Sequence, residues 1–201
     1  GHLAEASPDD VFVYELSSFQ LEDLKKSPHI AVLLNLYPEH LDHHGTMKSY
    51  AKAKANIAKY QSKSDYLVFN SESEEIRGIA SSSKAQTIPF RPTLRKKAAI
   101  TASLEPVYIV GRLFGISRRA IQNSISQFTP LPHRLENAGT WQGITFYNDS
   151  LATIPQATIA ALDILGNNVH TLIAGGFDRG IPLKPLADRI RKSKIKTLRS
   201  E

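Results

Sequence analysis

The stretch IAVLLNLYPEHLDHHGTMKSYAKAKANIAKY, residues 30–60, decides the fold. It begins with an apolar run of strand length at residues 30–35, continues through a polar loop, and ends in a pattern that predicts a helix from Thr46 to Tyr60. Strands that alternate with helices favour an α/β fold, in which a parallel sheet has helices on its faces. The same alternation predicts further buried strands at residues 11–16, 65–69 and 86–90 and a helix at 73–81.

A second set of elements follows an interruption at FTPLPHRLE, residues 128–136. Its two prolines end a helical region, in which a long helical pattern at residues 98–114 is followed by a helix that Ser117 caps. Such a segment suits a connection between domains. Beyond it, the patterns predict strands at residues 143–148 and 169–174 and helices at 155–165 and 185–191.

The composition of the 201 residues narrows the class of protein. Without cysteine there are no disulfides and no thiolate metal sites, which fits a cytoplasmic protein. No apolar run is long enough to cross a membrane, so we expect no membrane insertion. Much of the net charge of +6 lies at residues 91–97 and 189–196, which leaves nucleic-acid binding as an alternative function. Because no aromatic residues or nucleic-acid motifs accompany these runs, we expect only weak, nonspecific attraction.

Two residues that could bind a cation follow two successive predicted strands. Glu15 lies near the end of the strand at residues 11–16, and His40 lies in the loop after the strand at 30–35. Ligands bind at this edge of open α/β sheets, and successive strands are usually neighbours, so the two side chains can converge. A carboxylate and an imidazole together suit a divalent cation. The alternative for Glu15 is a strand-end carboxylate that faces solvent.

The other histidines of the loop suggest a different hypothesis. His40, His43 and His44 could together bind zinc, but the spacing H-x-x-H-H resembles none of the usual zinc patterns. We therefore expect His43 and His44 to be loop residues that are exposed or bonded to the backbone.

Lys54 differs from the other lysines of its predicted helix. Helical spacing places it on the apolar face, whereas the others share a second face. Its side chain either reaches solvent along its methylene groups or keeps a partly desolvated ammonium with a depressed pKa. Such an amine is nucleophilic, and carbon dioxide can convert it to a carbamate that holds a metal. The apolar face comprises Met47, Tyr50, Lys54, Ile57 and Ala58, and the other face Lys48, Lys52, Lys59 and Lys63.

Several motifs occur in one order and together are more specific than any one of them. They resemble the Mur ligases of peptidoglycan synthesis, and ELSSFQLE favours the D-glutamate-adding members over folylpolyglutamate synthases. The resemblance implies part of a parallel-sheet-rich central ATPase-type domain in residues 1–129 and a partial, Rossmann-like C-terminal domain in 130–201. The motifs are ELSSFQLE (15–22), PEHLDHHG (38–45), YAKAKANI (50–57), LPHRLE (131–136), FYNDS (146–150) and GGFDRG (175–180).

The same resemblance implies an ATP-dependent carboxylate–amine ligase, active as the full-length protein. A carboxylate of UDP-N-acetylmuramoyl-L-alanine is activated as an acyl phosphate, and the amine of D-glutamate then forms the amide. The implied cofactors are ATP and two Mg²⁺ ions, and the implied protein is a cytoplasmic monomer. By motif, Glu15 matches a ligand of one Mg²⁺, His40 a ligand of the second, and Lys54 the lysine that is carbamylated to support it.

Other positions match the family's substrate contacts. Ser17 and Gln20 lie where the family contacts the muramoyl substrate. Arg134 and Asp149 match positions that reach the nucleotide when the C-terminal domain closes, Asp149 through the ribose. Arg179 stands near a basic position of the closed site.

The chain also departs from the family. It contains no G-x-x-x-x-G-K-[ST] phosphate loop and begins with Gly, so we expect a piece of a longer protein that binds ATP poorly by itself. The segment RKKAAITAS, residues 95–103, lacks the asparagines of the family's adenine contact, and Leu151 and Ile154 replace a lysine and an asparagine. We interpret the chain as a divergent ligase. The alternatives are a degenerate, non-catalytic regulatory or scaffold protein and a ligase that adds a different amino acid.

Overall fold

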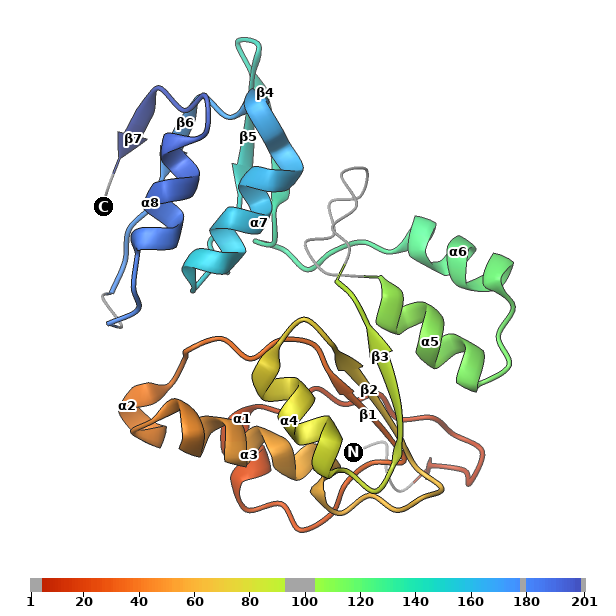
Figure 1. Ribbon diagram of the computed structural model, residues 1–201. Coiled ribbons are helices and arrows are strands. Elements are labelled where there is room, and N and C mark those ends of the chain that lie inside the picture. Colours follow the sequence, from red (N-terminus) through yellow and green to blue (C-terminus); the bar gives the residue numbers. More distant parts are fainter. Residues whose placement is uncertain (1–4, 93–103, 178–179, 200–201) are drawn as a thin grey trace.

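The computed structural model describes residues 5–92, 104–177 and 180–199. Its first part contains a three-stranded parallel sheet in the order β1-β2-β3, formed by β1 (Ile30–Leu33), β2 (Tyr66–Asn70) and β3 (Gln86–Phe90) (Figure 1). Ile30 pairs with Tyr66, and Tyr66 pairs with Gln86. The predicted α/β class with a parallel sheet is therefore confirmed.

Four helices accompany this sheet: α1 (Ser18–Glu22), α2 (Leu41–His44), α3 (Met47–Lys59) and α4 (Glu74–Ser82). Thr46 and Ser73 begin α3 and α4 as caps, since their hydroxyls accept from the backbone N–H groups of Ser49 and Ile76. Parallel strands that follow one another in order 1-2-3 place both right-handed crossover helices on one face, and α3 and α4 lie side by side there (Figure 1).

The core of the first part lies between the sheet and helices α3 and α4. β2 is its central strand, and Leu67 and Val68 on opposite faces of that strand are fully buried. Burial on both faces is typical of a parallel strand, whose neighbours and helices remove it from water. The core cluster consists of Ala31, Leu33, Leu36, Tyr50, Ala58, Leu67, Phe69, Ile76 and Ala80.

Asn56 holds α1 against α3. Its side chain is buried, and its Nδ2 donates to the carbonyls of Leu21 at 2.8 Å and Glu22 at 2.9 Å. These carbonyls lie at the end of α1, where the helix offers them no N–H of its own, although that of Leu21 also accepts from the N–H of Leu24 just beyond the helix. The two bonds from the amide therefore fix the position of α1 on α3.

The prediction of a buried strand at residues 11–16 is wrong. Val11, Phe12, Val13 and Tyr14 are exposed, Val13 by 94%, and the segment has no regular secondary structure. An apolar run becomes a strand only where a neighbouring strand completes the hydrogen-bond ladder. Among the described residues, β1 is paired only with β2, so nothing pairs with residues 11–16.

Two helices, α5 (Glu105–Leu113) and α6 (Arg118–Gln127), follow the sheet and pack against each other. The hydroxyl of Ser117 accepts from the N–H of Ala120, as expected of the predicted cap. Of the helix predicted at residues 98–114, residues 105–113 form α5, and residues 98–103 lie outside the described residues.

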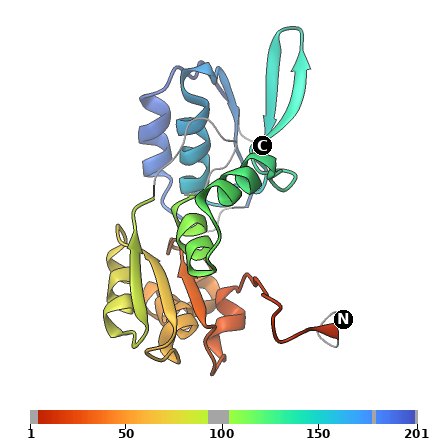
Figure 2. The ribbon, with the colours of Figure 1, turned by 90° about the vertical axis from the view of Figure 1, so that its right-hand side faces the viewer.

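The second part joins the first through residues 128–135, which have no helix or strand (Figure 1). The β4–β5 hairpin, which pairs antiparallel, projects from it (Figure 2). β6 and β7 pair in parallel, and α7 packs against α8. Within the described residues, no helix has the length and apolar character needed to cross a membrane. The elements are β4 (Glu136–Trp141), β5 (Ile144–Asn148), α7 (Pro155–Leu165), a 3₁₀ turn η2 (Gly166–Asn168), β6 (Thr171–Ile173), α8 (Lys184–Arg191) and β7 (Thr197–Arg199).

Candidate active site

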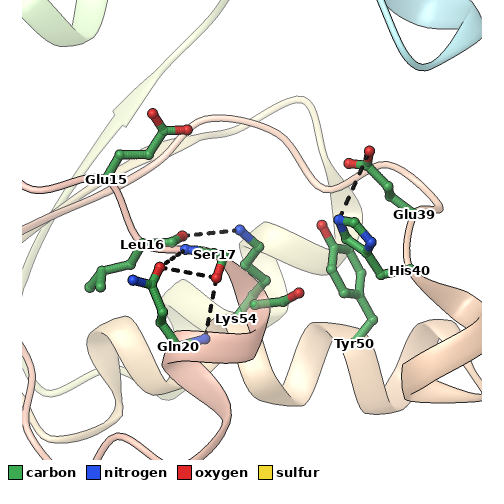
Figure 3. A pocket seen from close by; sticks show the side chains of 9 residues that line it. Glu15, Leu16, Ser17, Gln20, Glu39, His40, Tyr50 and Lys54 are labelled. Atoms are coloured by element: carbon green, nitrogen blue, oxygen red, sulfur yellow. Dashed lines mark hydrogen bonds and ion pairs between the residues drawn. The ribbon is translucent and has the colours of Figure 1, made fainter.

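A polar cavity of about 390 Å³ lies between the start of α1, the loop that precedes α2, and α3 (Figure 3). Five residues that the sequence analysis selected line it: Glu15, Ser17, Gln20, His40 and Lys54. The structure thus brings together side chains from three separate segments. The remaining lining residues are Leu16, Ser18, Glu39 and Tyr50.

A second cavity, of about 270 Å³, is a weaker candidate. Its lining among the described residues consists of Ile88, Ile109, Arg112 and Leu113, so this part of its wall is mostly apolar and holds no carboxylate or imidazole. None of these four residues was selected from the sequence as a site residue. The cavity at α1 and α3 is therefore the candidate site.

Ser17 and Gln20 form the N-terminal cap of α1. The N–H of Gln20 donates to Ser17 Oγ at 3.3 Å, and the N–H of Ser17 donates to Gln20 Oε1 at 2.9 Å. This reciprocal arrangement is a capping box, which satisfies two backbone donors that the helix leaves unpaired. Both residues therefore hold one wall of the cavity in place.

Lys54 extends from α3 into the cavity, between the start of α1 and Tyr50 (Figure 3). Its side chain is half-buried, and its Nζ donates to the carbonyl oxygen of Leu16 at 3.4 Å. Burial lowers the pKa of the Lys54 ammonium, while the charges of Glu15 and Glu39 act in the opposite direction without cancelling the effect. The sequence left two alternatives for Lys54, a side chain that reaches solvent and a partly desolvated ammonium. This environment agrees with the second.

His40 has an unusual backbone. Its φ of 56° and ψ of 33° place it in the left-handed region, which is costly for a residue other than glycine, of order 1–3 kcal/mol. The ring packs edge-on to Phe19 with the centroids 5.0 Å apart, and Nε2 lies 4.0 Å from Glu39 Oε1. The strained turn and the Phe19 contact together direct the imidazole to the cavity.

Glu39 and Tyr50 were not selected from the sequence, although both line the cavity. Glu39 immediately precedes His40, and its Oε1 accepts from Thr153 Oγ1 of the second part at 3.4 Å. Tyr50 is buried one helical turn before Lys54, and burial, followed by the charge of Glu39, raises the pKa of its hydroxyl. The signals that could have found them are the position beside His40 and the i, i+4 spacing to Lys54.

His43 and His44 do not line the cavity. His43 lies in α2 rather than in the expected loop; it is exposed as expected, and its Nε2 bonds the Glu22 carboxylate at 2.9 Å. The expectation is wrong for His44, whose ring is buried in α2 with Nε2 3.0 Å from Ser18 Oγ. The physical reason is that α2 turns this ring toward the buried side of α1.

The remaining predicted residues lie away from the cavity. Asp149 Oδ1 accepts from the N–H of Leu135 at 2.8 Å, next to Arg134 in the connecting segment. Burial raises the pKa of the Asp149 carboxyl, although the Leu135 N–H and the charge of Arg134 act to lower it. Arg179 and residues 95–103 lie outside the described residues.

Comparison with known protein families matches residues 2–125 to the Mur ligase middle domain. The chain belongs to the Mur ligase family. All residues that line the cavity lie within the matched range, whereas Arg134 and Asp149 lie beyond it.

Curated relatives of this Mur ligase chain agree with that assignment. The UDP-N-acetylmuramoylalanine–D-glutamate ligase of Enterococcus hirae is 38% identical over 205 residues, which cover 88% of this chain and 44% of the relative. The enzyme of the same name from Symbiobacterium thermophilum is 33% identical over 232 residues, with 96% and 50% covered. The chain thus spans about half the length of the curated relatives it matches.

A solved structure supports the fold of the Mur ligase chain. It is the MurF ligase from Thermotoga maritima in complex with ADP, with a TM-score of 0.65 and 16% sequence identity, which covers 87% of this chain and 48% of that one. At this identity the likeness concerns the fold alone.

Proposed function

We propose that this chain is part of an ATP-dependent ligase that joins D-glutamate to UDP-N-acetylmuramoyl-L-alanine. The observation that carries the proposal is the meeting of Glu15, His40 and Lys54 at one cavity, in a chain 38% identical to a D-glutamate ligase. We assign residues 1–129 to the central domain and 130–201 to the C-terminal domain. The proposal includes a cytoplasmic monomer, as the family resemblance implies.

The side chains of the cavity fit the metal that the family implies. Glu15, Glu39 and His40 offer oxygen and nitrogen donors, which suit a hard or borderline divalent cation such as Mg²⁺. Bound there, Mg²⁺ would neutralise phosphoryl oxygens of ATP. In this proposal Glu15 and His40 hold two separate ions.

Lys54 fits this role only after it loses its positive charge. Since burial lowers the pKa of its ammonium, a larger fraction is the free amine at a given pH, and the free amine is the form that attacks carbon dioxide. The nitrogen forms a bond to the carbon of carbon dioxide and loses one proton to solvent, which would leave a carbamate anion at the end of the same side chain. The nearby carbonyl of Leu16 holds the nitrogen in place.

The other residues are proposed to position substrates. Ser17 and Gln20 face the muramoyl substrate from the α1 wall, and the Gln20 amide can donate to it from Nε2, because Oε1 is the atom that forms the cap. Arg134 and Asp149 contact the nucleotide when the second part approaches the cavity, and Arg179 adds positive charge. The contact between Thr153 and Glu39 supports such an approach, since it already joins the second part to the loop of His40.

Phosphate release by the full-length protein that contains this chain tests the proposal. With ATP, Mg²⁺ and UDP-N-acetylmuramoyl-L-alanine present, we expect release that depends on D-glutamate and that L-glutamate does not support. If no phosphate is released with any amino acid, the degenerate, non-catalytic alternative is favoured. Release with another amino acid favours a ligase of different specificity.

Lys54→Ala tests the assigned site in the same assay. We expect turnover to fall on the order of 10- to 100-fold, because a group that supports a metal ligand is lost. Short carboxylates added to the buffer should restore part of the activity, since they can replace the carbamate. Lys52→Ala is the matched control, because Lys52 is exposed on the same helix. Normal turnover in Lys54→Ala, with Lys52→Ala also active, would show that Lys54 has no such role.

A further inference from the structure

A second group of metal-binding side chains lies outside the candidate active site. Glu22, His43 and His44 each offer one ligand atom, and the three atoms lie within 4.8 Å of one another. None of the three residues lines the polar cavity. Glu22 ends α1, and the two histidines form the last part of α2.

Packing holds the three side chains close together. The Phe19 ring lies 4.7 Å from the ring of His43 and 5.6 Å from that of His44, and the two imidazoles are 4.8 Å apart, nearly perpendicular. His43 Nε2 lies 2.9 Å from Glu22 Oε2. The cluster is therefore arranged by contacts that exist without any ion.

The environment of His44 points to an incomplete set of interactions. Its ring is only 8% exposed, Nε2 bonds Ser18 Oγ, and Nδ1 is buried with no hydrogen-bond partner among the described residues. A buried polar atom without a partner is unfavourable, and its presence in a folded protein calls for an explanation. Glu22 and His43 are half-exposed, so an ion can enter from solvent.

We propose that Glu22, His43 and His44 bind one divalent transition-metal ion of the zinc type, at a site separate from the polar cavity. Two imidazoles and one carboxylate, with the fourth position open to water, are a common zinc set, whereas Mg²⁺ and Ca²⁺ prefer oxygen ligands. Ligands about 2.0–2.1 Å from one tetrahedral ion lie roughly 3.3 Å apart, so small side-chain adjustments bring the three atoms into range.

Binding requires a change in protonation. The hydrogen bond between His43 Nε2 and Glu22 is replaced by bonds from both groups to the ion, and the Nε2 proton moves to Nδ1 or leaves to solvent. The spacing in the sequence does not reveal this site, because its third ligand comes from α1 rather than from the histidine loop.

The ion would join two walls of the polar cavity. Ser17 caps the start of α1 and lines the cavity together with Gln20, and α2 directly follows His40. A bond between the end of α1 and the end of α2 therefore fixes the distance between these walls. The proposal assigns no catalytic step to this ion, and it holds independently of the ligase assignment.

Titration of the metal-free full chain, prepared without a histidine tag, tests this proposal. We expect calorimetry to show one equivalent of Zn²⁺ or Co²⁺ bound at this site. Bound Co²⁺ should give the visible absorption band of a low-coordinate complex. Mg²⁺ should not compete with either ion. Glu22→Gln and His43→Gln should each weaken Zn²⁺ binding at least about tenfold. Circular dichroism and thermal unfolding without metal confirm that these half-exposed substitutions leave the fold intact.

Two control variants separate this site from the alternatives. His29→Gln changes another exposed histidine that lies 2.9 Å from a carboxylate, that of Asp65, and should leave binding unchanged. His40→Gln should also leave it unchanged. Loss of Zn²⁺ binding in His40→Gln but not in His43→Gln would place the ion in the polar cavity and overturn the proposal. Equal binding by all four variants, or no saturable binding by the parent chain, would overturn it as well.

Discussion

Two lysines of α3 have different environments because of where the helix places them. Lys52 and Lys54 are two positions apart, so their side chains point to nearly opposite sides of the helix. Lys52 is exposed and hydrated, whereas Lys54 is half-buried and donates to Leu16. The helical period of the apolar residues was enough to predict this difference, because a regular helix converts spacing directly into direction.

Asp65 offers a test of stability against pH. Its carboxylate accepts from the N–H and hydroxyl of Ser62 at 2.7 and 2.9 Å and lies 2.9 Å from His29 Nδ1. The Ser62 backbone bond, followed by the His29 bond, lowers the pKa of Asp65. With a lowered folded pKa, the stabilisation is present above the unfolded pKa of about 3.9 and is lost as the pH falls through the folded value.

We therefore expect Asp65→Asn to lower the free energy of unfolding at pH 7, and the difference from the parent chain to shrink below about pH 4. Urea unfolding across this range measures it. Asp23→Asn is the control, since Asp23 is exposed and no side-chain hydrogen bond is found for it in the described residues. A difference that stays constant down to acid pH would contradict the linkage.

Some residues of the sites could not be predicted because they meet only through folding. Glu22 lies 21 positions before His43 in the chain, and nothing in either local pattern relates them. Likewise, Thr153 reaches Glu39 across 114 positions. Residues within one loop or one helix, such as His40 and Lys54, are easier to select, because their neighbours along the chain already fix their setting.

At the scale of elements, the parallel βαβ pattern was predictable and the edges of the sheets were not. β1, β2 and β3 lie where the apolar runs predicted them. The prediction of burial is wrong for most of β3, an edge strand in which only Phe90 is buried, whereas β2 is buried by neighbours on both sides. β4 is exposed along its whole length and has a bulge between Asn137 and Gly139, so it shows no apolar signal. β7 lies in a basic segment and forms only through pairing with β6.

The packing of α5 on α6 depends on Gly111. A Cβ at this position would lie 2.6 Å from Ile121 Cδ1 and 3.0 Å from its Cγ1, and Ile121 is buried. We expect overpacking in Gly111→Ala to lower the free energy of unfolding by about 1–3 kcal/mol. The higher helix propensity of alanine offsets up to about 1 kcal/mol of this loss. Ile121→Val in the same chain removes the Cδ1 contact and should recover part of the loss.

Gly78→Ala provides the matched comparison. Gly78 lies inside α4, and a Cβ there would meet nothing within 4 Å. This substitution should raise the free energy of unfolding by about 0.5–1 kcal/mol, because alanine loses less backbone entropy in a helix. Chemical denaturation of the three variants measures both effects. Equal shifts at the two glycines would show that the Ile121 contact does not decide the outcome.

At the scale of the whole molecule, the basic charge is partly neutralised within the fold. Arg189 Nε lies 2.7 Å from Asp163 Oδ1, and Arg191 lies 3.3 Å from Asp188. These pairs turn part of the basic segment at residues 189–196 toward acidic partners in α7 and α8. The number of basic residues in a sequence segment therefore overestimates the positive electrostatic potential that the segment presents to a nucleic acid.

We expect fluorescence anisotropy with a short DNA duplex to detect weak binding at low salt that disappears near physiological ionic strength, as counterion release predicts. Arg189→Ala should change this binding little, since Arg189 is already paired with Asp163. Tight binding that persists at high salt would support the nucleic-acid alternative.

The exposed segment Val11–Tyr14 has a practical consequence for work with this chain. Four apolar residues in a row, exposed by 58%, 59%, 94% and 71%, have the composition of segments that self-pair into intermolecular sheets. We therefore expect this segment to pair between molecules more readily as the concentration of the chain rises, independently of how stable the core is.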